Sequence, residues 1–286
     1  MCEIDNFIGI TGFRLKAELR TRFSHSLLLF VVIFVMSVLH SKYFWPLFTI
    51  ASIVVVCQGG CLIPRGQRYR NFTVSTPLRP NQILVLGFMG GREPWDNDKR
   101  SVRKLALKLR SMHDPAICVE TVENKKRSLA LKLITNAFDR NYDGKLDEQE
   151  RSSVRLIIYG QSFGGAAVVK LARQLKKMDV PVALTVQIDS VGRDDNMIPS
   201  NVIRAANLFQ RNGWFIKGEP EIRAEDPART EITGNFEYDY SHKKIDISSV
   251  PIMKKAFRVA HTRMEYDQEV WDKVERLILD TIRQLR

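Results

Sequence analysis

Ser162 is the residue of this chain best placed to act as a nucleophile. It is the central residue of Gly160-Gln161-Ser162-Phe163-Gly164, which follows a β-rich apolar run at 154–159 and precedes a predicted helix at 166–178. A G-x-S-x-G sequence between a strand and a helix is typical of a sharp turn that lifts the serine hydroxyl above a sheet. This context favours a nucleophile over a plain Gly-Ser turn.

The chain also offers a base and an acid after Ser162. A serine hydroxyl is a weak nucleophile near neutral pH, so it needs a base that a carboxylate orients. His261 is the favoured base, in a loop-like stretch just before the last predicted helix. Asp189 is the favoured acid because it ends a predicted strand at 182–188, at the sheet edge where ligand chemistry gathers. The other candidates are His242, Asp226 and Asp239.

A glycine-containing loop could supply hydrogen-bond donors for an oxyanion. The predicted strand 83–86 is followed by Gly87-Phe88-Met89-Gly90-Gly91, whose glycines would let the backbone approach a substrate closely. We predict one donor to be the backbone N–H of Phe163, next to the serine, and the second to be that of Phe88 or Met89. The alternative is a simple glycine turn.

Residues 139–150, DRNYDGKLDEQE, form a second chemical motif. They fit D-x-[DN]-x-[DN]-G-x5-E, the calcium loop of EF-hands, in which side-chain and backbone oxygens at fixed positions coordinate the ion. We predict a structural Ca²⁺ rather than a sensor site, because the chain has no partner loop and little room for an exiting helix. The alternative is a solvated acidic turn. The predicted ligands are Asp139, Asn141, Asp143, Lys145 (through its carbonyl), Asp147 and Glu150.

Strands and helices alternate along residues 83–286. This rhythm predicts an α/β fold, a mostly parallel sheet flanked by helices. Residues 190–250 are rich in loops, with one further strand expected near 214–216 and a lid. The predicted strands are 83–86, 116–122, 154–159 and 182–188, and the predicted helices are 95–110, 128–138, 166–178 and 267–285.

Residues 83–285 resemble an α/β-hydrolase of the lipase and esterase type. The motifs that carry the resemblance are LVLGFMGG, IIYGQSFGG, VQID and the histidine of VAHTRMEYD. The resemblance implies a Ser162, His261 and Asp189 triad that hydrolyses carboxylic esters, lipid esters among them, through an acyl-enzyme. A thioesterase or acyltransferase would use the same triad. A hypothesis of a different class is a non-catalytic, calcium-binding cell-envelope protein that keeps the fold as a scaffold.

The N-terminal region, residues 1–64, is expected to act as a membrane or signal segment. It contains an apolar run at 27–39 and a stretch without charge at 43–64, of the length that a spanning helix needs. Alternatives are a cleaved signal starting at Met36, a lipoprotein-like site at Cys61, and a buried core helix. Residues 65–82 are predicted to be a linker with a leading strand. The hydrolase domain would then be membrane-anchored or exported to the cell envelope.

The formal net charge of +12 favours anionic surfaces or substrates, and the alternative is a basic solvated surface. Nucleic acid is excluded as an expected partner, because the chain has no zinc-finger spacing, aromatic RNA-binding motif or basic-region helix. The expected partners are an ester or lipid substrate and, through the N-terminal segment, a membrane. The sequence does not predict the oligomeric state.

Overall fold

The computed structural model describes residues 66–286, except residues 214, 215, 249 and 251 and the side chains of 252–258. The predicted membrane or signal segment, with Met36 and Cys61, lies outside the described residues. Among the described helices, none is both long and apolar enough to cross a membrane.

The core of the described domain is a six-stranded sheet in the order β2-β1-β3-β4-β6-β8. Every pair of neighbouring strands in it is parallel, and Leu84 of β1 lies opposite Leu156 of β3. A second, two-stranded sheet joins β5 (Met197–Ile198) to β7 (Arg223–Ala224). The bounds of the six strands are β1 Ile83–Met89, β2 Ile117–Glu123, β3 Leu156–Gln161, β4 Val182–Ile188, β6 Val202–Phe209 and β8 Glu231–Glu237.

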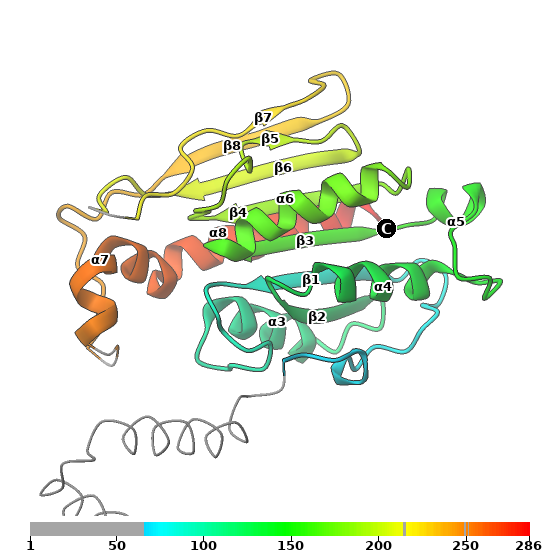
Figure 1. Cartoon of the computed structure of the whole chain (residues 1–286), viewed down its shortest axis with the longest axis horizontal. Helices are drawn as coiled ribbons and strands as arrows, with labels where there is room; N and C mark the ends of the chain where they lie inside the picture. Colours follow the sequence, from blue (N-terminus) through cyan, green and yellow to red (C-terminus); the bar gives the residue numbers. More distant parts are fainter. Residues whose placement is uncertain (1–65, 214–215, 249, 251) are drawn as a thin grey trace, which may run out of the picture. The chain divides into compact units, whose positions relative to one another are not determined.

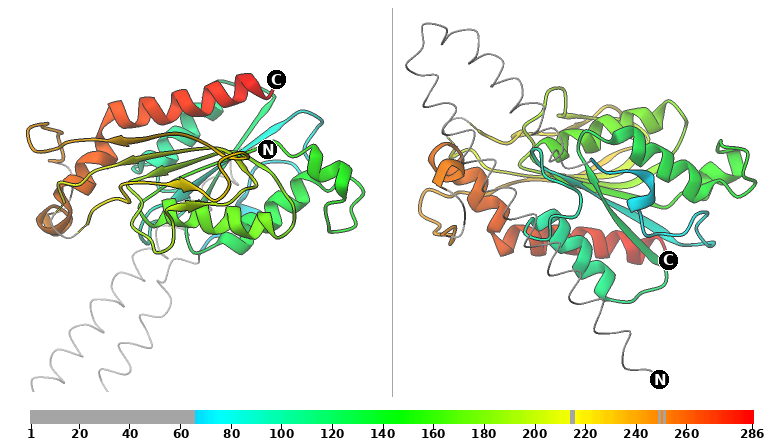
Figure 2. Two further views of the ribbon diagram at one scale, coloured as in Figure 1. Left: turned by 90° about the horizontal axis from the view of Figure 1, so that it is seen from above. Right: turned by 60° about the horizontal axis from the view of Figure 1, so that its bottom comes forward.

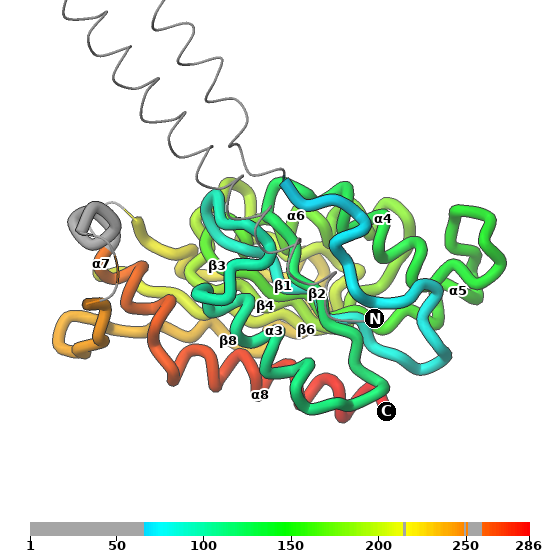
Figure 3. The backbone as a smooth tube through the Cα atoms, turned by 90° about the horizontal axis from the view of Figure 1, so that it is seen from below, coloured from blue at the N-terminus to red at the C-terminus, as the bar shows by residue number. Residues whose placement is uncertain are grey.

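Helices cover both faces of the sheet (Figures 1 and 2). Helices α4 (Arg127–Phe138) and α6 (Phe163–Lys176) pack on one face, and α3 (Ser101–Ser111) and α8 (Gln268–Gln284) pack on the other. The tube in Figure 3 shows these two layers with the strands between them. The remaining helices are the short 3-10 helix η2 (Tyr69–Asn71), α5 (Glu148–Ser152) and α7 (Ile252–Tyr266).

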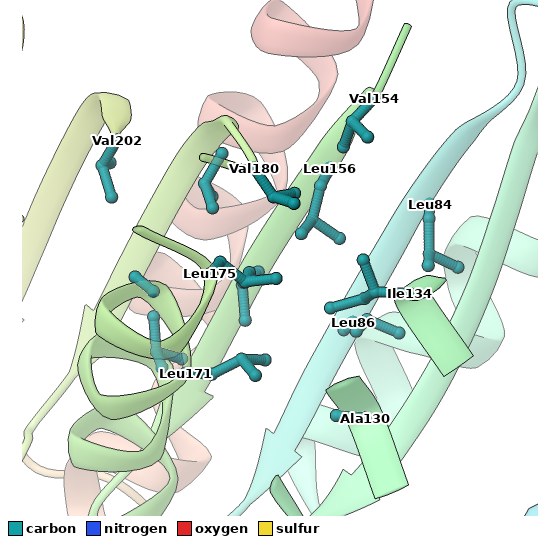
Figure 4. Packing of buried hydrophobic residues seen from close by; sticks show 14 of the residues in the cluster. Leu84, Leu86, Ala130, Ile134, Val154, Leu156, Leu171, Leu175, Val180 and Val202 are labelled. Carbon is teal, nitrogen blue, oxygen red and sulfur yellow. The ribbon is translucent and has the colours of Figure 1, made fainter. Parts of the chain in front are cut away.

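The central strands are apolar because both of their faces are covered. All residues of β1, β3 and β4 are buried, as expected for parallel strands between two helical layers. Figure 4 shows Leu171 and Leu175 of α6 and Ile134 of α4 packed together with Leu86 and Leu156 of the sheet. Truncating one such leucine to alanine should cost about 2–5 kcal/mol of stability.

The predicted α/β fold with a parallel sheet is confirmed, and so are the four predicted strands in their order. Of the strand expected near 214–216, residues 214 and 215 lie outside the described residues and Ile216 is not in a strand, while β6 and β8, which were not predicted, both join the main sheet. Strand β8 lies at the edge and is only partly buried, so its sequence EITGNFE carries little of the apolar pattern that marks a strand.

The segment 66–82 contains no strand, contrary to the expectation of a leading strand. It is nevertheless anchored to the domain. The backbone N–H groups of Thr73 and Val74 both donate to the carboxylate of the buried Glu120, and Gln67 Nε2 donates to the carbonyl of Thr121 at 2.8 Å.

Candidate active site

Ser162 occupies a strained turn between β3 and α6. Its φ of 58° and ψ of −125° lie outside the common regions for a residue with a side chain, a feature that clusters at functional sites. Glycine is required on both sides by close packing. A Cβ on Gly160 would lie 2.5 Å from the carbonyl oxygen of Gly164, and one on Gly164 would lie 2.2 Å from that of Phe88. The G-x-S-x-G pattern therefore matches the crowding at this turn.

The structure brings the predicted acid and base together. Asp189 directly follows β4 and is fully buried, and its Oδ2 lies 2.6 Å from Nδ1 of His261. Gln161 and Ile188 are paired across β3 and β4, and the N–H of Ser162 donates to the carbonyl of Ile188 at 2.9 Å. The serine and the aspartate thus leave neighbouring strands at the same edge of the sheet.

His261 lies in helix α7, whereas the sequence predicted a loop at this position. The side chain is 11% exposed and its other ring nitrogen, Nε2, is left for proton transfer once Nδ1 bonds the carboxylate. The remaining candidates lie elsewhere. His242 is exposed, Asp226 accepts from backbone N–H groups of its own turn, and Asp239 accepts from Asn212 and Ser241.

Ser162 and His261 line one cavity of about 440 Å³. It lies at the carboxyl ends of β1 and β3, where the strand order reverses direction and where ligands bind in open α/β sheets. Within the described part of the chain, no hydrogen bond joins the Ser162 hydroxyl to His261. Such contacts are often long before a substrate is bound.

Gln210 supports Asp189 in a way that the sequence did not reveal. Its Nε2 lies 3.3 Å from Oδ1 and 3.1 Å from Oδ2 of Asp189, and 3.0 Å from the carbonyl oxygen of Ile216. Its Oε1 accepts the N–H of Gly213 at 2.8 Å, which fixes the orientation of the amide. Gln210 directly follows β6, a strand that the sequence analysis did not predict, so no signal pointed to it.

Of the three residues predicted to donate to an oxyanion, one lines the cavity and two do not. Phe163 is the first residue of α6 and lines the cavity. Phe88 and Met89 lie inside β1, are fully buried and do not line the cavity, whereas Gly90 and Gly91 do. The backbone of Gly90 approaches the serine closely, because a Cβ placed on it would lie 3.4 Å from Cβ of Ser162.

The donor loop was predicted to include Phe88 and Met89, whereas the residues of this segment that line the cavity start at Gly90. This difference has a physical cause. The predicted strand ends at Leu86 because Gly87 is typical of the start of a turn. In the structure Gly87 is within β1, where a Cβ would lie 2.7 Å from the hydroxyl of Tyr159. This glycine makes room for a neighbouring tyrosine, so the strand continues and the loop begins at Gly90.

Charged side chains form one wall of the cavity. Arg100 Nη1 lies 2.9 Å from both carboxylate oxygens of Glu265, one helical turn after His261, and Arg100 also pairs with Glu93. Burial acts to lower the pKa of Arg100, but the carboxylates of Glu265 and Glu93 outweigh it and raise that pKa. Glu219 also lines the cavity, and burial and the nearby Asp195 raise its pKa.

The predicted calcium loop has the backbone form that its motif requires. Gly144 has a φ of +81°, and its N–H donates to Asp139. Glu150 reaches back to accept from the N–H groups of Arg140, Asn141 and Asp147. Asp139 and Glu150 are 6% and 5% exposed and pair with no basic side chain of the described region.

The exiting helix of this loop, α5, has only five residues, as the sequence predicted. Among the described residues, no three Asp, Glu, His or Cys side chains gather in a metal-binding arrangement. The loop backbone therefore fits a calcium loop, while its acidic side chains do not by themselves identify a site, and Ca²⁺ remains a prediction.

No protein-family model and no curated protein matches the sequence. Among solved structures, the domain is similar to a cutinase-like protein from Cryptococcus sp., with 12% identity, a TM-score of 0.39 and coverage of 73% of this chain and 98% of that one. It is also similar to RedJ, a thioesterase of the prodiginine pathway in Streptomyces coelicolor, with 12% identity, a TM-score of 0.25 and 48% of each chain covered. RedJ with a bound polyethylene glycol gives 13% identity, a TM-score of 0.29 and coverage of 63% and 87%. These scores are too low to indicate a function, which must be argued from the site itself.

Proposed function

We propose that this protein is a serine hydrolase that cleaves carboxylic esters or thioesters through Ser162, His261 and Asp189. The observation that carries the proposal is the 2.6 Å contact between Asp189 and His261, at the edge of the cavity that also holds the strained Ser162. A buried carboxylate that orients a histidine beside a serine is the arrangement that acyl transfer needs.

Each residue has a defined part in the proposed reaction. Ser162 Oγ attacks the carbonyl carbon, and His261 Nε2 takes the hydroxyl proton. His261 then gives this proton to the leaving alcohol or thiol as its bond to the acyl group breaks. A water molecule, deprotonated by the same nitrogen, hydrolyses the acyl-enzyme and restores the serine. Asp189 holds the imidazole through Nδ1 and stabilises the imidazolium that forms in each half-reaction.

The oxyanion is assigned to two backbone N–H groups, those of Phe163 and Gly90. Phe163 begins α6, so its N–H also belongs to the positive end of the helix dipole. Gly90 lines the same cavity and lies against Ser162.

An activity-based fluorophosphonate probe tests the proposal. We expect the folded full-length protein to be labelled and the Ser162→Ala variant to remain unlabelled. His261→Ala should also abolish labelling, whereas His242→Ala, which changes an exposed histidine, serves as the matched control and should not. Absence of labelling in the folded wild-type protein, with and without Ca²⁺, would favour the non-catalytic scaffold.

The scaffold alternative is supported by one observation, the two buried carboxylates Asp139 and Glu150 that lack a basic partner in the described region. We propose that this loop binds a structural Ca²⁺, and that residues 1–64 attach the domain to a membrane or direct its export. Neither proposal is needed for the chemistry at Ser162, so each can fail independently of it.

A further inference from the structure

A second groove opens beside the cavity of Ser162. It has a volume of about 1020 Å³. The side chain of Phe163, 53% exposed, lines both spaces. A substrate held at Ser162 can therefore extend past Phe163 into the groove. The residues common to both are Gly91, Glu93, Phe163, Val191 and Gly192.

The groove is lined by five basic side chains from four separate segments. They are Arg92 in the loop after β1, Lys125 and Arg127 around the start of α4, Lys170 in α6, and Arg193 in the loop after β4. We refer to these five residues and the space between them as the basic groove. Arg92, Lys125 and Arg193 are exposed, while Arg127 and Lys170 are half-buried.

None of these five cations forms a salt bridge with a described residue. The single acidic residue that lines the groove, Glu93, pairs with Arg100. Arg127 also holds a buried Nε without a hydrogen-bond partner within the described region. An ordinary protein surface intersperses both signs of charge, so five unpaired cations around one concave space indicate an anionic ligand.

The backbone adds to this positive field. Helices α4 and α6 both begin at the basic groove, and neither has a side-chain cap at its N-terminus. Phe163, Ala166, Ala167 and Lys170 lie on one face of α6 along the groove wall. The N-terminal ends of helices carry partial positive charge and favour phosphate groups.

We propose that the basic groove binds a phosphate-bearing part of the substrate. This inference rests on the proposed hydrolase function and names the chemical class of its substrate: an ester or thioester whose acyl or leaving group carries one or more phosphates. The groove also has an apolar lining, made by Phe163, Ala166, Ala167 and Val191, which can contact the aliphatic part of such a substrate.

Binding to the full-length Ser162→Ala variant tests the proposal without requiring turnover. Two pairs of soluble probes isolate the phosphate and distinguish its source. Phosphopantetheine is compared with pantetheine, and dihexanoyl phosphatidic acid, below its micelle concentration, with dihexanoylglycerol. We expect the phosphate-bearing member of at least one pair to bind at least about 10-fold more tightly in calorimetry. Its affinity should fall steeply between about 50 and 500 mM NaCl.

Charge reversal in the groove provides the structural test. Lys125→Glu and Arg193→Glu change exposed side chains, so the fold should persist, and each should weaken binding of the preferred phosphate probe by about 10-fold or more. Lys244→Glu, at an exposed lysine outside the groove, is the matched control and should leave it unchanged.

The outcomes separate this inference from the proposed function. Preference for phosphopantetheine assigns the phosphate to a thioester of a phosphorylated thiol, and preference for phosphatidic acid assigns it to a phospholipid. Equal binding within both pairs, or binding that the two groove variants do not weaken, overturns the inference. If Ser162 reacts with the fluorophosphonate but no phosphate probe is preferred, the groove proposal alone fails. If a phosphate probe binds but Ser162 never reacts, the hydrolase proposal alone fails.

Discussion

Oδ2 of Asp189 lies 2.6 Å from Nδ1 of His261, although 72 residues separate the two in the chain. The contact joins the end of strand β4 to helix α7 and fixes which ring nitrogen of the histidine faces the cavity. Replacing Asp189 with asparagine keeps the shape but removes the charge and favours the wrong tautomer of the imidazole. We expect kcat for p-nitrophenyl acetate to fall by about 10³–10⁴-fold with little change in thermal stability. An Asp189→Asn variant with near wild-type kcat would contradict the assigned role.

Gln210 is predicted to act as a positioning residue through Asp189. Its amide contacts both oxygens of the Asp189 carboxylate, so Gln210→Ala should let that carboxylate move out of line with His261. We expect kcat for p-nitrophenyl acetate to fall by about 10-fold with little change in KM. A variant that loses thermal stability but keeps the wild-type kcat would assign Gln210 a structural role only.

Gly164 should be intolerant of any side chain. A Cβ there would lie 2.2 Å from the carbonyl oxygen of Phe88, and backbone cannot move aside as a flexible side chain can. We expect Gly164→Ala to lower the free energy of unfolding by at least about 2 kcal/mol in urea titrations. Gly66→Ala is the matched control, because its new Cβ would meet only the tips of Glu123 and Lys126. Equal stability of the two variants would show that the turn relaxes more readily than its packing indicates.

Calcium should stabilise the domain if the loop 139–150 binds it. A ligand that binds only the folded state raises stability by about 2.7 kcal/mol at 100 times its dissociation constant. We expect the melting temperature to rise with millimolar Ca²⁺ and to return with a chelator. Glu150→Gln should abolish the rise, because it removes the carboxylate of the last ligand position, whereas Glu148→Gln, an exposed neighbour, should retain it. An unchanged melting temperature would mean that the loop is a solvated turn.

Local signals predicted the parts of the site that depend on local structure. The turn at Ser162 follows from a strand, two crowded glycines and a helix, all within one short segment. Asp189 was found because a strand that ends in an aspartate must present it at the carboxyl edge of a parallel sheet.

Features set by tertiary packing were not readable from the sequence. Gly87 looked like a turn residue, but it is a strand residue that accommodates Tyr159. His261 was predicted to lie in a loop, but it lies in α7. No sequence pattern indicated a role for Gln210, because its contact with Asp189 depends on the packing of neighbouring strands.

The all-parallel sheet has a consequence for when the molecule becomes functional. Each pair of parallel strands needs a crossover connection. The pairing of Leu84 with Leu156 must therefore close a long loop, at a cost in chain entropy, before its contacts stabilise the sheet. Chains are synthesised from the N-terminus, so Ser162 and Asp189 emerge well before His261 in the penultimate helix. Under the proposed function, a nascent chain therefore has a nucleophile without a base. Activity begins only after α7 has docked and brought His261 to Asp189, so biosynthesis itself delays the chemistry.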